Sequence, residues 1–374
     1  MERFTIISGH YLNSEFSNSR QPPQTRNIGD PEIYRLANIR PTINSGFFYT
    51  YSDLRALKLK KDITNVDGDL SRKIKGLFLA VLLIIFVAEP PLPALENPLS
   101  SPVSINVEQL RSLPPGKTVI IDTRSGWKFF LGHIPRALNL SDWRDFTEKR
   151  GGVQGMLIED PDYIVGKLRP LGIDLQKTIV LYGDPTDRWR TDGRFLWMFE
   201  RFGFKSVRIL TGGLDFWKES GEKIERGQQD RRSPSMLSTQ DIRLNDKVMA
   251  TGSWINGNLA SGRLAIIDNR TKKEYEGATP YGSARGGHIP KAIHIPWERF
   301  FTESGVLKSK SELSALLEKN GVRPDQEIVV YCTGGVRSGM AYYAFRSLGY
   351  SVRNYDGSWW DWSLHSELPV EGSS

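Results

Sequence analysis

The residue best suited to covalent chemistry is Cys332, the only cysteine in this chain of 374 residues. It follows the apolar run IVVY (328–331) and precedes the loop TGGVRS (333–338). Two glycines in such a loop allow backbone N–H groups to turn toward the sulfur, and a following helix presents its positive end there. With the charge of Arg337, these groups favour the thiolate over the thiol, whose usual pKa is about 8.5. The pattern predicts a nucleophilic thiolate.

Few residues are suited to binding a metal ion. The five histidines show no HExxH or similar spacing, and one cysteine can form neither an intrachain disulfide nor a multi-cysteine metal site. We therefore expect no metal and no cofactor.

The charge distribution argues against nucleic acid as a partner. The formal net charge is +7, and residues 1–75 contain twelve Lys or Arg against eight Asp or Glu, which leaves +3 for the rest. The remaining part has no basic stripe of the kind that nucleic-acid binding requires. We expect a monomer that binds a small anionic substrate.

Beyond residue 100 the sequence repeats itself, and the repeat identifies the elements that position Cys332. Four pairs of similar blocks follow in the same order: VIIDTR (119–124) and AIIDNR (265–270), GHIPRALNL (132–140) and GHIPKAIHI (287–295), LGIDLQKTIVLYG (171–183) and NGVRPDQEIVVYC (320–332), LTGGLDFW (210–217) and YDGSWWDW (355–362). Four matched blocks in order indicate a duplication.

Each copy alternates short β-branched runs with amphipathic stretches, which is typical of βαβ units around a parallel sheet. We predict an α/β fold with two domains, at 101–220 and 246–370, joined by a polar, exposed linker at 221–245. Cys332 then lies between a strand and a helix at the carboxyl end of the second sheet, where α/β proteins form their binding crevices.

The first hundred residues have a different character. Residues 1–70 are polar without a sustained apolar period, so we expect a poorly ordered extension. Residues 71–98 contain a basic cluster, the apolar stretch GLFLAVLLIIFVA (76–88) and a proline-rich end. This pattern is typical of a signal or membrane-anchor segment and predicts export, or anchoring with the domains facing outward; a buried core element and a cytoplasmic location remain the alternatives.

The paired DxR and GHIP motifs, the loop CTGGVRS and the closing YDGSWWDW resemble the tandem rhodaneses over about residues 101–370. This family includes thiosulfate and 3-mercaptopyruvate sulfurtransferases. The resemblance implies two rhodanese-like domains, each an open parallel sheet flanked by helices, of which only the second is catalytic. Gly183 stands in the first copy where Cys332 stands in the second, so the first copy has no nucleophile.

The resemblance also implies the roles of individual residues. Cys332 takes the outer sulfur of the donor as a persulfide and passes it to a thiophilic acceptor such as cyanide or a thiol. Arg337 and Arg270 bind the anionic donor, although a strand-end hydrogen bond to Asp268 is the first interpretation of Arg270. The loop residues cradle the persulfide with backbone amides: Thr333, Gly334, Gly335, Val336 and Ser338.

Three functional alternatives stay open on the sequence. The donor can be thiosulfate or 3-mercaptopyruvate, because Glu274 stands where thiosulfate enzymes have a further Arg. The protein can also be a persulfide carrier without turnover. A related phosphatase is disfavoured, because only four residues separate Cys332 from Arg337 and the loop is short for a tetrahedral phosphate.

A signal-like segment some seventy residues into a chain suggests that translation starts near Val66 or Leu70. Peptide mass spectrometry of the native protein should then find no peptide from residues 1–60. Recovery of any such peptide would contradict the alternative start.

Overall fold

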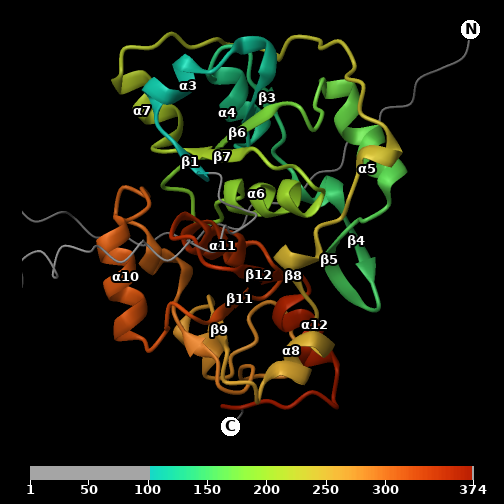
Figure 1. Cartoon of the computed structure of the whole chain (residues 1–374), viewed down its shortest axis with the longest axis vertical. Helices are drawn as coiled ribbons and strands as arrows, with labels where there is room; N and C mark the ends of the chain where they lie inside the picture. The colour runs from blue at the N-terminus through green and yellow to red at the C-terminus, as the bar shows by residue number, and fades with distance from the viewer. Residues whose placement is uncertain (1–101, 373–374) are drawn as a thin grey trace, which may run out of the picture. The chain divides into compact units, whose positions relative to one another are not determined.

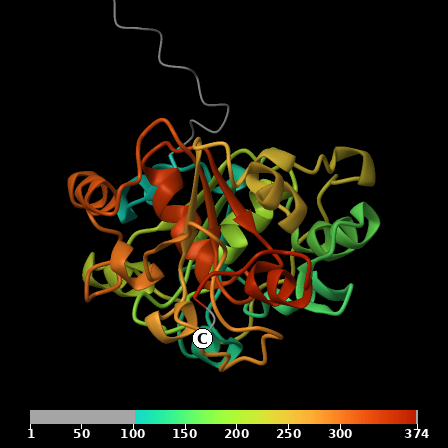
Figure 2. The same cartoon turned by 90° about the horizontal axis from the view of Figure 1, so that it is seen from below.

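The computed structural model describes residues 102–372, which lie within one compact unit, Leu92–Ser374. This part of the chain forms two parallel β-sheets flanked by helices, one from each copy of the repeat (Figure 1). Figure 2, a view from below, shows the orange and red elements of the second domain in front of the green elements of the first. The prediction of two α/β domains with parallel sheets is confirmed.

The two sheets have the same strand order. From edge to edge, the first contains β1 (Ser104–Ile105), β7 (Val207–Leu210), β6 (Thr178–Tyr182), β2 (Thr118–Asp122) and β3 (Leu138–Asn139). The second contains β8 (Met249–Ala250), β12 (Val352–Tyr355), β11 (Glu327–Tyr331), β9 (Leu264–Asp268) and β10 (Ile293–His294). Neighbouring strands within each sheet are parallel, so the carboxyl ends of the strands lie along one edge of that sheet.

Helices cover both faces of each sheet. The first domain contains α3 (Val107–Ser112), α4 (Gly126–Leu131), α5 (Pro161–Leu168), α6 (Asp192–Arg201), α7 (Gly213–Glu219) and the antiparallel hairpin β4 (Thr147–Arg150) and β5 (Val153–Leu157). The second contains α8 (Gly252–Asn258), α9 (Lys272–Tyr275), α10 (Lys310–Lys319), α11 (Arg337–Ser347) and α12 (Ser358–Leu364). The central strands β6 and β11 are therefore buried on both faces, which explains their continuous apolar sequences.

Local sequence sets the helix boundaries. Helix α10 begins after Ser309, whose hydroxyl accepts a hydrogen bond from the backbone N–H of Glu312 while the Glu312 carboxylate accepts one from the backbone N–H of Ser309. Leu313 and Leu317, four residues apart, form its buried face.

Helices α6 and α11 lie side by side between the two sheets and join the domains (Figure 1). They approach closely because glycines face each other at the contact: a Cβ on Gly193 would lie 2.5 Å from the backbone oxygen of Gly339. Further along, Glu200 of α6 accepts hydrogen bonds from Arg346 (2.8 Å) and Tyr342 of α11. One apolar core consequently continues from the first sheet through both helices to the second.

The segment at 221–245, predicted as an exposed linker, is attached to the first domain. The backbone N–H of Ser235 donates to the carbonyl of Arg169 (2.9 Å), and Leu237 and Ile242 are buried. Most of its charged side chains are exposed.

The predicted extension at 1–70 and the predicted anchor segment at 71–98, including 76–88, lie outside the described residues. Within 102–372, no helix is long and apolar enough to cross a bilayer. The membrane contact through 76–88 stays a prediction.

The glycine contact predicts the outcome of a single substitution. Gly193→Ala should lower the free energy of unfolding by about 1–3 kcal/mol, because the added methyl group meets the backbone of α11 and forces the helices apart. Thermal unfolding would show this as a lower Tm.

Gly257→Ala in α8 is the matched control, since nothing lies within 4 Å of its added Cβ. It should be neutral or stabilise by about 0.5–1 kcal/mol, and equal effects of the two changes would contradict the packing account.

Candidate active site

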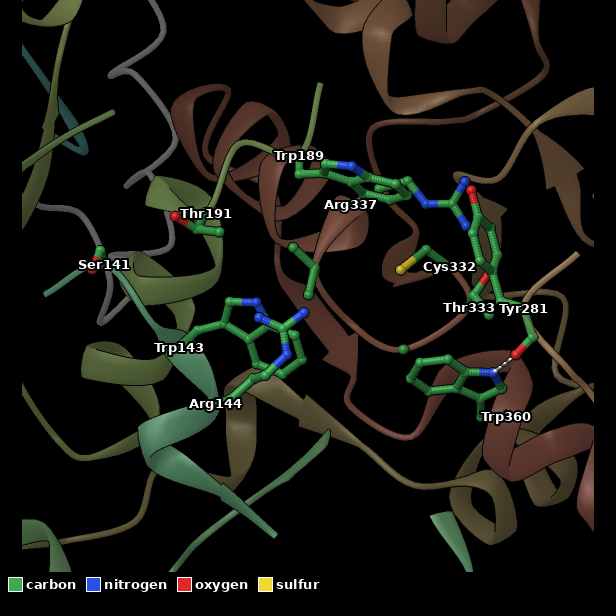
Figure 3. Close-up of a pocket in the computed structure, with 12 residues that line it drawn as sticks. Ser141, Trp143, Arg144, Trp189, Thr191, Tyr281, Cys332, Thr333, Arg337 and Trp360 are labelled. Carbon is green, nitrogen blue, oxygen red and sulfur yellow. Dashed lines mark hydrogen bonds between the residues drawn. The ribbon is translucent and has the colours of Figure 1, made fainter. Parts of the chain in front are cut away.

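Cys332 directly follows β11 at the carboxyl edge of the second sheet, as predicted, and is only 2% exposed. Its backbone N–H donates to the hydroxyl of Ser358 (3.2 Å), and its carbonyl accepts from the N–H of Trp359 (3.0 Å). Both partners belong to α12, so this helix fixes the backbone of the cysteine. The sulfur points into a cavity (Figure 3).

The loop that follows requires glycine at two positions. Gly335 has a φ of 78°, and a Cβ there would lie 2.6 Å from Nη1 of Arg194 and 2.7 Å from the carbonyl oxygen of Asp356. A Cβ on Gly334 would lie 2.3 Å from the ring of Trp360. The two glycines therefore let the loop fold tightly between Cys332 and the start of α11.

The surroundings of Cys332 favour its thiolate. Burial alone would raise the pKa of the thiol, but the charge of Arg337 and hydrogen bonds from the backbone N–H groups of Ser338 and Gly334 outweigh it, so the pKa is lowered. The hydroxyl of Ser338 also points at the sulfur, at 3.7 Å. The first turn of α11 thus surrounds the sulfur with positive charge and donors.

Arg337 is held by a buried carboxylate. Its Nη1 and Nη2 donate to the two carboxylate oxygens of Glu274 at 2.8 and 2.7 Å, and Nη2 also donates to the hydroxyl of Thr333 at 2.6 Å. Burial would raise the pKa of Glu274, but the hydrogen bonds and charge of Arg337, with hydrogen bonds from Thr333 and Thr271, lower it to about 2. The pair is therefore ionised at neutral pH.

The ion pair adds a second role to the one predicted for Arg337. Its guanidinium donates to Glu274 and Thr333, and donor binding by Arg337 stays a prediction. Arg337 still lines the cavity, and its charge acts on Cys332. Glu274, which the sequence marked only as a departure from the thiosulfate enzymes, is its missing partner.

Arg270, the second residue predicted to bind the donor, is not among the residues that line the cavity. Its guanidinium is 1% exposed and donates to the carboxylate of Asp268 (2.6 Å) and the carbonyl of Gly287 (2.7 Å). Arg124 makes the same contacts with Asp122 and Gly132 in the inactive copy. A contact present in both copies fixes the strand end, which is the role expected first for Arg270, and donor binding by Arg270 stays a prediction.

Both domains line the cavity, which has a volume of about 420 Å³ (Figure 3). The second domain contributes Tyr281, Cys332, Thr333, Gly334, Val336, Arg337 and Trp360, and the first contributes Ser141, Trp143, Arg144, Trp189 and Thr191. Gly335 and Ser338, two of the predicted loop residues, are not among the residues that line the cavity. Among residues 102–372, no group of three or more His, Cys, Asp or Glu is placed to hold a metal ion.

Sequence reasoning missed all five residues from the first domain. They follow β3, as Trp143 does, or precede α6, as Trp189 does. The repeat offered one signal: the loop before α6 is longer and richer in Trp and Arg than the loop before α11. In the closing YDGSWWDW block, Trp360 lies at the cavity wall, whereas Trp359 is buried.

In the first copy, a carboxylate lies beside the position that corresponds to Cys332. Gly183 follows β6 as Cys332 follows β11, and the carboxyl carbon of Asp192 lies 3.2 Å from the place of its missing Cβ. Asp192 is the first residue of α6 and pairs with Arg190 at 2.6 Å. A thiolate at this position would therefore meet a like charge.

The role of Arg337 predicts how the thiol titrates. Replacing the pair in Glu274→Gln/Arg337→Met should raise the pKa of Cys332 by at least about one pH unit, because it removes the nearby positive charge without leaving Glu274 unpaired. The pH dependence of iodoacetamide alkylation measures this midpoint. The control is Glu327→Gln/Arg353→Met, which removes an ion pair of 2.6 Å whose carboxylate is at the opposite end of β11. An unchanged midpoint in the first variant would contradict the account.

Known proteins match most of the described region. The Rhodanese-like domain family matches residues 106–220 and 251–365. The thiosulfate sulfurtransferase of Azotobacter vinelandii is 30% identical over 276 residues, which cover 73% of this chain and 98% of that protein. The sulfur carrier protein TtuD of Thermus thermophilus is 32% identical and covers 64% of this chain and 85% of its own length. The crystal structure of SseA from Escherichia coli, a 3-mercaptopyruvate sulfotransferase, matches with a TM-score of 0.59 and 25% identity over 69% of this chain and 99% of that one. The chain therefore belongs to the rhodanese family and carries two rhodanese-like domains in tandem.

Proposed function

We propose that this protein is a sulfurtransferase in which Cys332 carries the transferred sulfur as a persulfide. The proposal depends most on the position of Cys332. It faces a cavity next to the first turn of α11, and its pKa is lowered there. A thiolate in this setting is a nucleophile at neutral pH.

With thiosulfate as donor, the chemistry is two substitutions at sulfur. The Cys332 thiolate attacks the outer sulfur, the S–S bond of thiosulfate breaks, and its electron pair leaves with sulfite. The persulfide then gives its outer sulfur to cyanide, which forms thiocyanate and returns the thiolate. Neither step transfers a proton, so the site needs no general base.

The second half of the cycle depends on the same groups. The persulfide is anionic, like the thiolate, so the backbone N–H groups of Gly334 and Ser338 and the charge of Arg337 can stabilise both. A site that favours both states lets the cysteine alternate between them.

Thiosulfate is the proposed donor because the Azotobacter relative, matched over 98% of its length, bears that activity in its name. 3-Mercaptopyruvate is the alternative donor, supported by the likeness to SseA. Similarity to the sulfur carrier TtuD favours a second candidate function, in which the persulfide passes to a protein acceptor without multiple turnover.

The direct test combines intact mass with steady-state kinetics. Wild-type protein mixed with thiosulfate or 3-mercaptopyruvate should gain the mass of one sulfur atom, and Cys332→Ala should gain none. Cyanide should remove the added mass and release thiocyanate over many cycles.

The outcomes separate the candidates. Loading with the mass of one sulfur but no turnover would indicate the carrier, and the donor that loads faster is the substrate. Loading of Cys332→Ala, or no loading of the wild type by either donor, would contradict the sulfurtransferase proposal.

A further inference from the structure

Helix α4 of the first domain (Figure 1) presents an apolar face to solvent. Trp127, Phe130 and Leu131 are 64%, 55% and 61% exposed, and their spacing places the three side chains on one side of the helix. Phe129, by contrast, is buried in the core of the domain. Several large apolar side chains gathered on one exposed face are typical of a surface that binds another molecule or a membrane.

The second copy of the repeat contains an equivalent helix, α9. Nδ1 of His133 lies 2.9 Å from the carbonyl oxygen of Phe129, and Nδ1 of His288 lies 2.8 Å from that of Tyr275. Each histidine ring also stacks on the same aromatic side chain. Phe129 and Tyr275 therefore occupy equivalent positions in the two copies.

This equivalence shows that the fold does not require the apolar face. Counting from Phe129 and Tyr275, the second copy has Lys273 where α4 has Trp127, and Glu276 where α4 has Phe130. Both charged residues are exposed. The same two positions can thus be charged in a rhodanese-like domain, so the apolar side chains of α4 have a role other than folding.

The segment at 225–232 lies along the end of α4. The backbone N–H of Gly227 donates to the carbonyl of Phe130 at 2.8 Å, and the Arg232 guanidinium donates to the carbonyl of Arg136. The charged side chains of this segment consequently border the first domain beside the apolar face.

Positive charge predominates around this face. Residues 126–136 and 225–232 together contain five Lys or Arg and two Asp or Glu. One of these cations, Lys128, pairs at 2.7 Å with Asp184, which lies outside both segments, so a net charge of +2 remains. An apolar face bordered by positive charge is complementary to the surface of an anionic bilayer.

The sequence before the described residues favours the same occupant. Fifteen residues separate the apolar stretch at 76–88 from β1. An extended chain of this length spans up to about 50 Å, and the expected radius of gyration of the two domains is about 18 Å, so α4 can reach a bilayer that holds 76–88. The stretch itself is a poor occupant, because the basic cluster at 71–75 would approach a face that is also positive.

We propose that the face formed by Trp127, Phe130 and Leu131 docks on the surface of an anionic lipid bilayer. The indole and the apolar side chains enter the boundary between headgroups and acyl chains, and the neighbouring cations face the lipid phosphates. The inference is independent of the proposed function, since none of these three side chains lines the cavity at Cys332.

The test places a fluorescent reporter on α4 of the full chain. A polarity-sensitive dye is attached to Phe130→Cys in a Cys332→Ser background, which removes the other thiol. Leu364→Cys is the matched control, because Leu364 is 46% exposed on α12 of the second domain. On vesicles of phosphatidylcholine and phosphatidylglycerol, doxyl-labelled lipids should quench the dye at position 130 at least about threefold more than the dye at position 364.

Two further changes test the physical basis of docking. Trp127→Lys, which introduces the residue type of the second copy, should lower the quenching at position 130 at least about threefold and leave the Tm unchanged. Vesicles of phosphatidylcholine alone should also lower it, because the attraction between the cations and anionic lipid is lost.

Equal quenching at positions 130 and 364, or quenching that neither Trp127→Lys nor neutral lipid lowers, would overturn the proposal. Shielding of the dye at position 130 without vesicles, in protein that sediments as a dimer, would overturn it in favour of a second copy of the chain. The same shielding in a monomer would overturn it in favour of a segment of the same chain. Each result can be read whether or not the protein transfers sulfur.

Discussion

The attraction between the thiolate of Cys332 and the guanidinium of Arg337 is the interaction on which the site depends, because a buried anion is unstable without a nearby positive charge. Arg337 is itself buried, so it needs a counter-ion, and Glu274 supplies one. Glu274 is in turn fixed by the capping box of α9, in which Thr271 donates to its carboxylate at 2.8 Å. A short helix after β9 therefore sets the electrostatics of a cysteine after β11.

The first domain is part of this site although Gly183 stands there in place of the cysteine. Arg194 of α6 reaches across the domain contact, pairs with Asp356 at 2.5 Å and donates to the carbonyl of Gly335 in the active loop at 3.4 Å. The backbone N–H of Leu157 in β5 donates to the same carboxylate at 2.7 Å. Duplication has thus produced one copy that bears the thiolate and another that supports its loop and completes the wall of its pocket.

The sequence predicted those features of the fold that depend on residues close together in the chain. Continuous apolar runs predicted the buried parallel strands, and the strand, glycine loop and basic residue around Cys332 predicted its thiolate. The ion pair of Arg337 was not predictable, because its partner Glu274 is 63 residues away in the sequence and only folding brings the two side chains together. Arg270 was assigned to the site from a resemblance, although a matching contact in the inactive copy has a structural role. Trp143 and Trp189 could not be assigned because their place in the wall arises only when the domains pack.

The central claim is that the transferred sulfur resides on Cys332 and is held by the loop that leads into α11. A crystal structure of protein treated with thiosulfate tests it most directly. The account predicts one additional sulfur atom bonded to Sγ of Cys332, pointing into the cavity and within hydrogen-bonding distance of loop N–H groups. An unmodified Sγ in protein that has released sulfite, or an added sulfur that lies outside the cavity, would contradict it.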